Sequence, residues 1–341
     1  MSGFLKTLAG QKMPIPPIWM MRQAGRYLKE YRDIRETTPD FISFCLDAEK
    51  ASNVTIQPIV RFGFDAAIIF SDILMVPWAL DRNVRFKPNH GPMLDPLADA
   101  ASLDEALLAD VPTKLAPVAN AITRTRSLLR DDTALIGFAG APWTVMTYML
   151  EGGSSKDFNL SRQMLWNDPA GFDKIMDIVT QATIEFLCLQ AHAGADALML
   201  FDSWASAVPS WHRDAVVNKP AATIIAALRA RGISQPVIGF PKGIGEGILP
   251  YVDQVGVDAL GLDHGMDIRW AHKNLPAYLP VQGNLDPISL LSGDDVMLAN
   301  IDDILGVFAD RPHIFNLGHG ITPATPIANV TKMITHVRQA R

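Results

Sequence analysis

Residues 194–202 read Gly-Ala-Asp-Ala-Leu-Met-Leu-Phe-Asp, a glycine and an aspartate before a continuous apolar run that ends in a second aspartate. Residues 63–72 and 256–263 repeat this order. A glycine suits the left-handed position just past a helix, and a short run that is apolar throughout suits a strand covered on both faces. The repeat therefore predicts helix, turn and strand in succession, which is the order of a parallel α/β fold.

Similar apolar runs recur along the whole chain, with helical stretches between most of them, such as 170–193. The predicted strands are 17–21, 66–70, 135–138, 197–201, 237–240, 259–262, 280–282 and 314–317. We interpret the stretch 85–96, which is polar and rich in proline, as an excursion within the domain. The pattern predicts a single (β/α)8 TIM barrel domain over 1–341, with an active-site cleft at the C-terminal ends of the strands. An open doubly wound sheet is the alternative.

Composition narrows the class of protein. The net charge of −6 argues against a nucleic-acid surface, because such a surface needs a basic stripe. Two cysteines, Cys45 and Cys188, fit a reducing compartment without a disulfide framework. The N-terminus lacks the apolar core of a signal peptide, and no apolar stretch approaches the ~18 residues of a membrane helix. These features predict a soluble, cytoplasmic protein with no membrane insertion.

Charged and glycine residues follow the predicted strands, where a barrel carries its chemistry. Arg22 comes directly after an apolar run, and a buried guanidinium there needs an anionic partner such as a carboxylate or a phosphate. If a helix starts near Ala24, Arg26 lies on a neighbouring face. The alternative for both arginines is pairing with Glu30 or Asp33 at a helix end.

Each of the other candidates also has a structural alternative. Asp72 and Asp202 end strands, and either could cap the next helix. His319 stands between two glycines, which let a ligand approach closely. Tyr148 falls in an apolar helical stretch and could be core, and Ser203 could be a turn residue. The glycine-rich loop 243–247 lacks the spacing of the known phosphate-binding motifs, and the histidines and cysteines show no metal-ligand spacing.

Seven motifs, in this order along the chain, resemble the uroporphyrinogen decarboxylase family. They are WMMRQAGRYLKEYR at 19–32, FSDIL at 70–74, GAPWT at 140–144, TYMLEG at 147–152, FDSW at 201–204, QGNLDP at 282–287 and FNLGHGI at 315–321. Four residues depart from the usual pattern of the family, and none of them is an assigned site residue: Lys29, Ser206, Thr322 and Ala328.

The resemblance implies a (β/α)8 barrel, usually dimeric, that acts in haem and porphyrin biosynthesis without metal or organic cofactor. It implies a carboxy-lyase that removes CO2 from the four acetate side chains of uroporphyrinogen III, a polyanionic tetrapyrrole, to give coproporphyrinogen III. Asp72 and Arg22 would be catalytic, with Asp72 stabilising the cationic pyrrole formed on ring protonation. The substrate-binding residues it implies are Arg22, Gln23, Ala24, Gly25, Arg26, Asp72, Tyr148, Ser203 and His319.

Two rival functions remain open. Zinc methyltransferases with the same fold resemble this chain, but they carry a His-x-Cys pair and a further cysteine as ligands. Neither Cys45 nor Cys188 has a histidine two residues before it. A non-catalytic tetrapyrrole carrier would keep the arginines and would not need Asp72.

Overall fold

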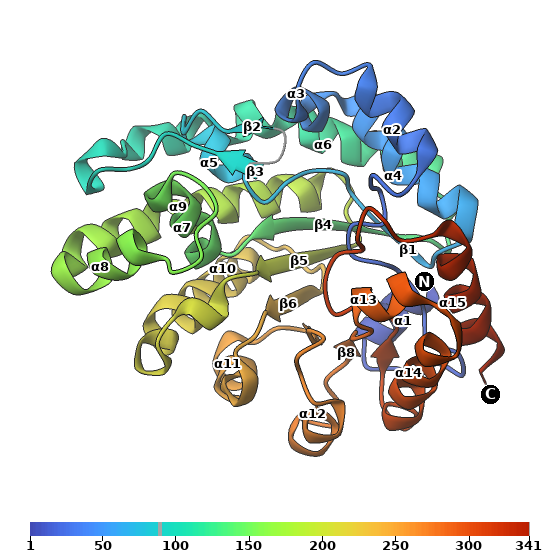
Figure 1. Cartoon of the computed structure of the whole chain (residues 1–341). Coiled ribbons are helices and arrows are strands. Elements are labelled where there is room, and N and C mark those ends of the chain that lie inside the picture. Colours follow the sequence, from blue (N-terminus) through green and yellow to red (C-terminus); the bar gives the residue numbers. More distant parts are fainter. Residues whose placement is uncertain (88–90, 341) are drawn as a thin grey trace.

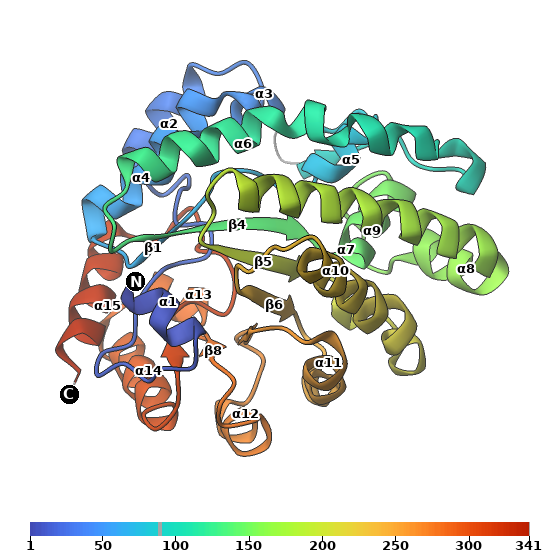
Figure 2. The same ribbon diagram turned by 180° about the vertical axis from the view of Figure 1, so that it is seen from behind.

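The computed structural model describes residues 1–87 and 91–340 and shows one curled, parallel seven-stranded sheet surrounded by helices (Figures 1 and 2). Its strands lie in the order β1-β4-β5-β6-β7-β8-β9. They are β1 (Ala66–Ile68), β4 (Ala134–Gly140), β5 (Ala197–Asp202), β6 (Val237–Pro241), β7 (Ala259–Gly261), β8 (Val281–Gln282) and β9 (His313–Ile314). The strands follow one another as in the sequence, without the reversal of a doubly wound sheet, so that alternative is wrong.

The helices form a layer outside the curled sheet (Figure 2). They are α1 (Gly3–Leu8), α2 (Lys29–Glu36), α3 (Phe41–Leu46), α4 (Ala48–Phe62), α5 (Met75–Ala79), α6 (Val111–Leu128), α7 (Pro142–Glu151), α8 (Asn159–Asn167), α9 (Pro169–His192), α10 (Lys219–Ala230), α11 (Ile248–Val255), α12 (Ile268–Asn274), α13 (Pro287–Ser292), α14 (Asp294–Val307) and α15 (Ile327–Gln339). The predicted helix over 170–193 is confirmed as α9. It begins after Asp168, whose carboxylate accepts from the Gly171 amide.

Seven of the eight predicted strands correspond to strands of the sheet, with ends that differ by a few residues. The segment 17–21 is different: it forms only an isolated parallel bridge between Ile18 and Phe315. Pro17 has no amide hydrogen, and the amides of Met20 and Met21 donate to the side chains of Gln23 and Asn316 rather than to a neighbouring strand. The segment still lies beside β1, because the Asp65 amide donates to the Ile18 carbonyl over 2.9 Å.

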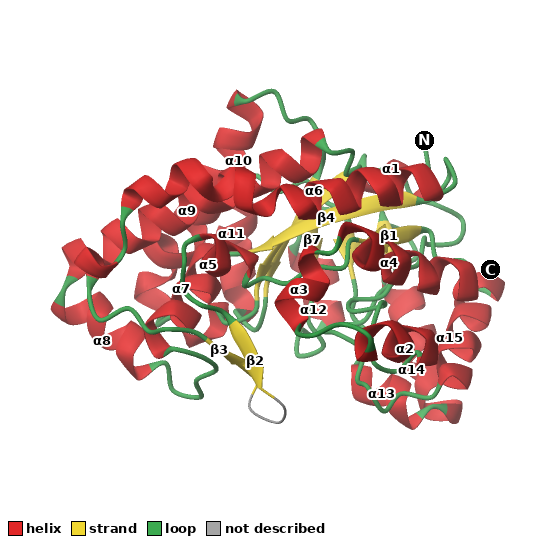
Figure 3. Cartoon of the chain, turned by 90° about the horizontal axis from the view of Figure 1, so that it is seen from above, coloured by secondary structure: helices red, strands yellow, loops and turns green. Residues whose placement is uncertain are grey.

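The stretch 85–96 leaves the main sheet, as predicted. Strands β2 (Arg85–Lys87) and β3 (Gly91–Met93) pair antiparallel in a separate two-stranded sheet, and residues 88–90 between them lie outside the described part of the chain. In Figure 3 this hairpin projects at the edge of the molecule, away from β4 and β7.

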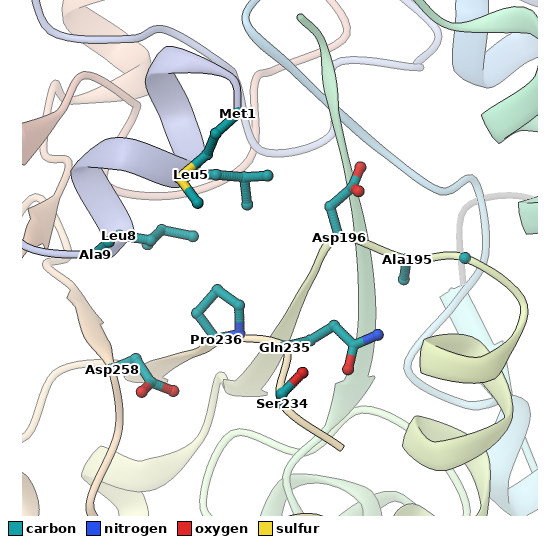
Figure 4. A pocket seen from close by; sticks show the side chains of 11 residues that line it. Met1, Leu5, Leu8, Ala9, Ala195, Asp196, Ser234, Gln235, Pro236 and Asp258 are labelled. Carbon is teal, nitrogen blue, oxygen red and sulfur yellow. The ribbon is translucent and has the colours of Figure 1, made fainter. Parts of the chain in front are cut away.

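The amino ends of the strands are covered by the N-terminal helix. Leu5 and Leu8 of α1 face the starts of β5, β6 and β7 across a cavity of about 530 Å³ (Figure 4). This cavity lies at the opposite end of the strands from the predicted site. In the described part of the chain, no helix has both the length and the apolar character needed to cross a membrane.

Candidate active site

Arg22 lies where the segment 17–21 ends. Met21 is held on both sides, because its amide donates to Asn316 Oδ1 over 3.0 Å and its carbonyl accepts from the Ile321 amide over 3.0 Å. The chain then turns sharply, and Arg22 has a left-handed backbone with a φ of 61°. Non-glycine residues rarely adopt this conformation, and strained residues gather at functional sites. The exposed Arg22 side chain lies against Gly320, where any Cβ would collide with it.

The arginines do not make the helix-end pairs that were the alternative. Glu30 pairs with Arg61, and Asp33 pairs with Lys29, each over 2.7 Å. Within residues 1–87 and 91–340, Arg22 and Arg26 form no ion pair. Both side chains are exposed, so both guanidinium groups are available to an anionic ligand.

The expected helix start near Ala24 is wrong. Helix α2 begins at Lys29, and residues 22–28 form successive turns that are held by side chains. Gln23 is fully buried; its Oε1 accepts from the Met20 amide and its Nε2 donates to the Ala66 carbonyl, each over 3.1 Å. Its own amide donates to the Met20 carbonyl, so Gln23 positions the loop. Of the three loop residues that the family resemblance assigns to substrate binding, Ala24 and Gly25 remain candidates to donate their backbone amides to a substrate carboxylate.

Asp72 follows β1 and is half-buried. Its Oδ1 accepts from the Leu74 amide over 2.9 Å, but Leu74 is the N-cap residue of α5 and no side chain caps that helix, so the capping alternative for Asp72 is wrong. Its Oδ2 accepts no hydrogen bond from any residue that the structure describes. Burial raises the pKa of Asp72 to about 6, and the nearby charge of Arg22 opposes this rise. Asp72 is therefore an ionised carboxylate at neutral pH with one acceptor oxygen unused.

Tyr148 and His319 lie close enough to Arg22 for its charge to act on both. Burial raises the pKa of the Tyr148 hydroxyl, and the charge of Asp72 raises it further. Tyr148 is half-buried and its ring lies 6.5 Å from that of Trp204, so it is not simply a core residue. Burial and the charge of Arg22 lower the pKa of His319 to about 4. His319 is thus a neutral hydrogen-bonding group at physiological pH.

The predicted residues differ in how closely they gather. The charge of Arg22 acts on Asp72, Tyr148 and His319, which come from three different parts of the chain. Ser203 is half-buried at the end of β5, next to Trp204. Arg26 lies on the loop after Arg22, and its charge acts on Tyr31.

Sequence reasoning missed the role of Thr144. Its Oγ1 donates to the buried Asp202 over 2.6 Å and accepts from the Trp204 amide over 3.0 Å. Asp202 is thus bound by a side chain of α7, and its alternative role as a helix cap is wrong. Burial raises the pKa of Asp202 to about 7, while the bond from Thr144 lowers it. The signal was present in the GAPWT motif, but neither residue spacing nor composition joined it to Asp202.

No three histidine, cysteine, aspartate or glutamate side chains gather as a metal site within residues 1–87 and 91–340. The cysteines Cys45 and Cys188 are both buried and unpaired as thiols. The predicted site residues that the charge of Arg22 reaches therefore supply one partly free carboxylate, a phenol and a neutral imidazole.

Known proteins match this chain along nearly its whole length. The family model described as "Uroporphyrinogen decarboxylase (URO-D)" matches residues 1–340. The chain is 47% identical over 335 residues to the uroporphyrinogen decarboxylase of Rhizorhabdus wittichii, covering 98% of this chain and 96% of that protein. It is 48% identical over 335 residues to the enzyme of that name from Sphingopyxis alaskensis, covering 98% and 97%.

A solved structure shares the fold. A methyltransferase from Methanosarcina mazei superposes with a TM-score of 0.80 at 17% identity, covering 98% of this chain and 97% of that one. This likeness concerns the fold alone, whereas the family model and the two decarboxylases match in sequence along nearly the whole chain. The protein belongs to the uroporphyrinogen decarboxylase family.

Proposed function

We propose that this protein is a uroporphyrinogen decarboxylase, a carboxy-lyase that removes CO2 from the four acetate side chains of uroporphyrinogen III to give coproporphyrinogen III. The observation that carries the proposal is the state of Asp72: a half-buried carboxylate beside Arg22, with one oxygen that no described residue engages. The family relatives named uroporphyrinogen decarboxylase support the same reaction.

The reaction explains why such a carboxylate is needed. An acetate on a pyrrole loses CO2 only if the ring accepts the electron pair, and protonation of a ring carbon makes the ring a cationic electron sink. Each cycle then releases CO2, the exocyclic carbon takes a proton to become a methyl group, and the ring carbon gives back the proton it gained, which restores the neutral pyrrole. A fixed negative charge that is already in place stabilises the developing cation without reorganisation. Asp72 Oδ2 supplies that charge and an acceptor for pyrrole N–H groups.

The other site residues bind the carboxylates of the substrate. Arg22 and Arg26 keep their charge at every physiological pH and match the fork of a carboxylate. Tyr148, Ser203 and neutral His319 donate hydrogen bonds to further carboxylate oxygens. Gln23 contributes indirectly, because its side chain fixes the turn that carries Arg22. An acidic protein can thus hold a polyanion because its positive charge is concentrated at one place.

The architecture proposed for this site is a closed (β/α)8 barrel formed by one domain. The support for closure is that the segment 17–21 forms backbone hydrogen bonds next to both edge strands of the seven-stranded sheet, β1 and β9. The Phe315 amide donates to the Pro17 carbonyl, and the Asp65 amide donates to the Ile18 carbonyl, each over 2.9 Å. Family resemblance adds the predictions of a homodimer, which sedimentation of the purified protein tests, and of catalysis without a cofactor.

The direct test is anaerobic incubation of the metal-stripped protein with uroporphyrinogen III, followed by oxidation and separation of the products by their number of carboxyl groups. We expect a ladder that ends at the tetracarboxylate. Arg22→Ala should slow the reaction at least roughly 100-fold, because the guanidinium orients the reacting carboxylate. A wild-type protein that binds the tetrapyrrole but releases no CO2 would instead be a carrier. Activity that requires zinc and a methyl donor would identify a methyltransferase.

A further inference from the structure

The loops that follow β6 and β7 are joined by a carboxylate outside the predicted site. Asp263 is buried, and its Oδ2 and Oδ1 accept from the amides of Gly243 and Gly265, each over 2.8 Å. These two amides lie directly after Lys242 and His264. Asp263 therefore fixes the backbone of both loops, and it brings Lys242 and His264 to adjacent positions at the carboxyl ends of the strands.

The glycine-rich turn around His319 packs against His264 and against Arg22. A Cβ at Gly318 would collide with the backbone of His264, and a Cβ at Gly320 would collide with the side chain of Arg22. The turn 318–320 thus lies between Arg22 on one side and His264 on the other. Arg22, Lys242 and His264 all lie close enough to His319 for their charges to lower its pKa.

Lys242 has no counter-ion in the part of the chain that the structure describes, although its side chain is half-buried. The carboxylate of Asp263, which joins the two loops, already accepts from two amides. The positive charges of Arg22 and Lys242 both lower the pKa of His319, so both side chains lie near the His319 ring. A partly buried ammonium group without a partner is unfavourable unless an anion binds it.

We propose that Lys242, with His264 beside it, binds a second carboxylate group of the substrate, on the opposite side of His319 from Arg22. This inference rests on the proposed function, because it assigns a further contact to the same polyanionic tetrapyrrole. A tetrapyrrole with a carboxylate on every side chain needs cations at separated points, and Arg22 lies on only one side of the turn 318–320. Lys242 takes no part in the proton transfers proposed above, so its contribution is to binding and orientation.

The test compares Lys242→Met with Lys242→Arg, and uses Lys174→Met, an exposed lysine on α9, as the matched control. We expect Lys242→Met to raise KM roughly tenfold with kcat within about twofold, because it removes a contact made equally in the ground and transition states. Lys242→Arg should keep KM within about threefold, and Lys174→Met should leave both constants unchanged. His264→Ala should raise KM less than Lys242→Met does.

Three outcomes would overturn the inference: an unchanged KM in Lys242→Met, a fall in kcat alone, or a Lys242→Arg variant as impaired as Lys242→Met. Thermal unfolding of each variant separates a loss of charge from a loss of structure. If the wild-type protein releases no CO2, the proposed function fails, and the inference is then tested with uroporphyrin, the stable oxidised octacarboxylate. Its binding, followed by tryptophan fluorescence, should be roughly tenfold weaker in Lys242→Met, and equal affinity would overturn the inference.

Discussion

The aspartates at the two ends of the strands differ in how fully the protein itself satisfies their carboxylates. At the amino ends, Asp65, Asp196 and Asp258 share one arrangement: Oδ2 accepts from an amide of the neighbouring segment and from an arginine. The amide bonds, from Ile18, Leu135 and Val237, are each 2.7 Å long. The arginines are Arg338, Arg126 and Arg229, at 3.0, 2.7 and 2.6 Å. Every one of these carboxylates joins two adjacent segments.

At the carboxyl ends the three aspartates diverge. Asp202 accepts from Thr144, and Asp263 accepts from two amides, so both hold loops in place. Asp72 alone of the three keeps an oxygen without a donor from the described residues. A carboxylate that is satisfied by its own protein stabilises the fold, whereas one that is left partly unsatisfied is available to a ligand. The comparison predicts that substitutions at the two ends will separate activity from stability.

The largest expected effect is at Asp72. Asp72→Asn keeps the shape and the bond from the Leu74 amide but removes the negative charge. We expect kcat to fall by roughly 10³-fold, because the cationic intermediate loses its fixed counter-charge. The measurement is the rate of CO2 release, with circular dichroism to verify folding. A variant that retains more than a tenth of wild-type kcat would show that the charge of Asp72 is not required.

The pH dependence tests the same carboxylate. Asp72 acts in its ionised form, and its pKa is raised to about 6, so kcat/KM should fall about tenfold per unit of pH below that value. Stability has the opposite sign: because the pKa of Asp72 is raised from 3.8 to about 6 on folding, the native state loses stability as the pH rises from about 4 to about 6, and the loss is complete above that. We therefore expect the free energy of unfolding of Asp72→Asn, relative to that of the wild type, to be higher at pH 8 than at pH 4, as measured by denaturation at both pH values. A constant difference across this range would contradict the assignment.

At the amino ends, the effect should fall on stability. Asp196→Ala removes the acceptor of the Leu135 amide and of Arg126, so we expect a loss of about 2–3 kcal/mol in the free energy of unfolding. Because the site lies at the other end of the strands, kcat/KM should stay within about twofold. Urea denaturation measures the first quantity and the decarboxylase assay the second.

The matched control is Asp132→Ala, which breaks the surface pair with Arg130, whose side chains are 66% and 80% exposed. This substitution should lower the free energy of unfolding by less than about 0.5 kcal/mol. If both variants lost the same free energy of unfolding, the contacts of Asp196 between the strands would stabilise the protein no more than an ordinary surface ion pair does.

Apart from the surface control, the smallest expected effect concerns Asp202, which lies at the carboxyl end but holds a loop in place as the structural aspartates do. Thr144→Val should cost about 1–2 kcal/mol, since it removes the donor to Asp202 and the acceptor of the Trp204 amide. Its hydroxyl lowers the pKa of Asp202, which is about 7, so the loss should be larger at pH 8 than at pH 6. A loss that does not vary with pH would show that Asp202 stays in one protonation state.

Local patterns in the sequence were sufficient for the order of elements and for most of the strands. A glycine after a helix, followed by a short apolar run, depends on residues that are adjacent in the chain, so it can be recognised without the fold. The residue after each run then falls at the carboxyl end of the sheet, which is why Arg22, Asp72 and His319 could be selected in advance. The seven family motifs, read along the same chain, led to the same reaction.

Tertiary structure decided which of these groups are occupied by the protein itself. Asp65 meets Arg338, 273 positions away in the sequence, and Thr144 meets Asp202 from another helix. The segment 17–21 was misjudged as a regular strand for the same reason, because its hydrogen-bond partners lie far away in the sequence, next to β1 and β9. A sequence shows that a side chain can bind, but only the folded chain determines whether its own groups already fill that capacity.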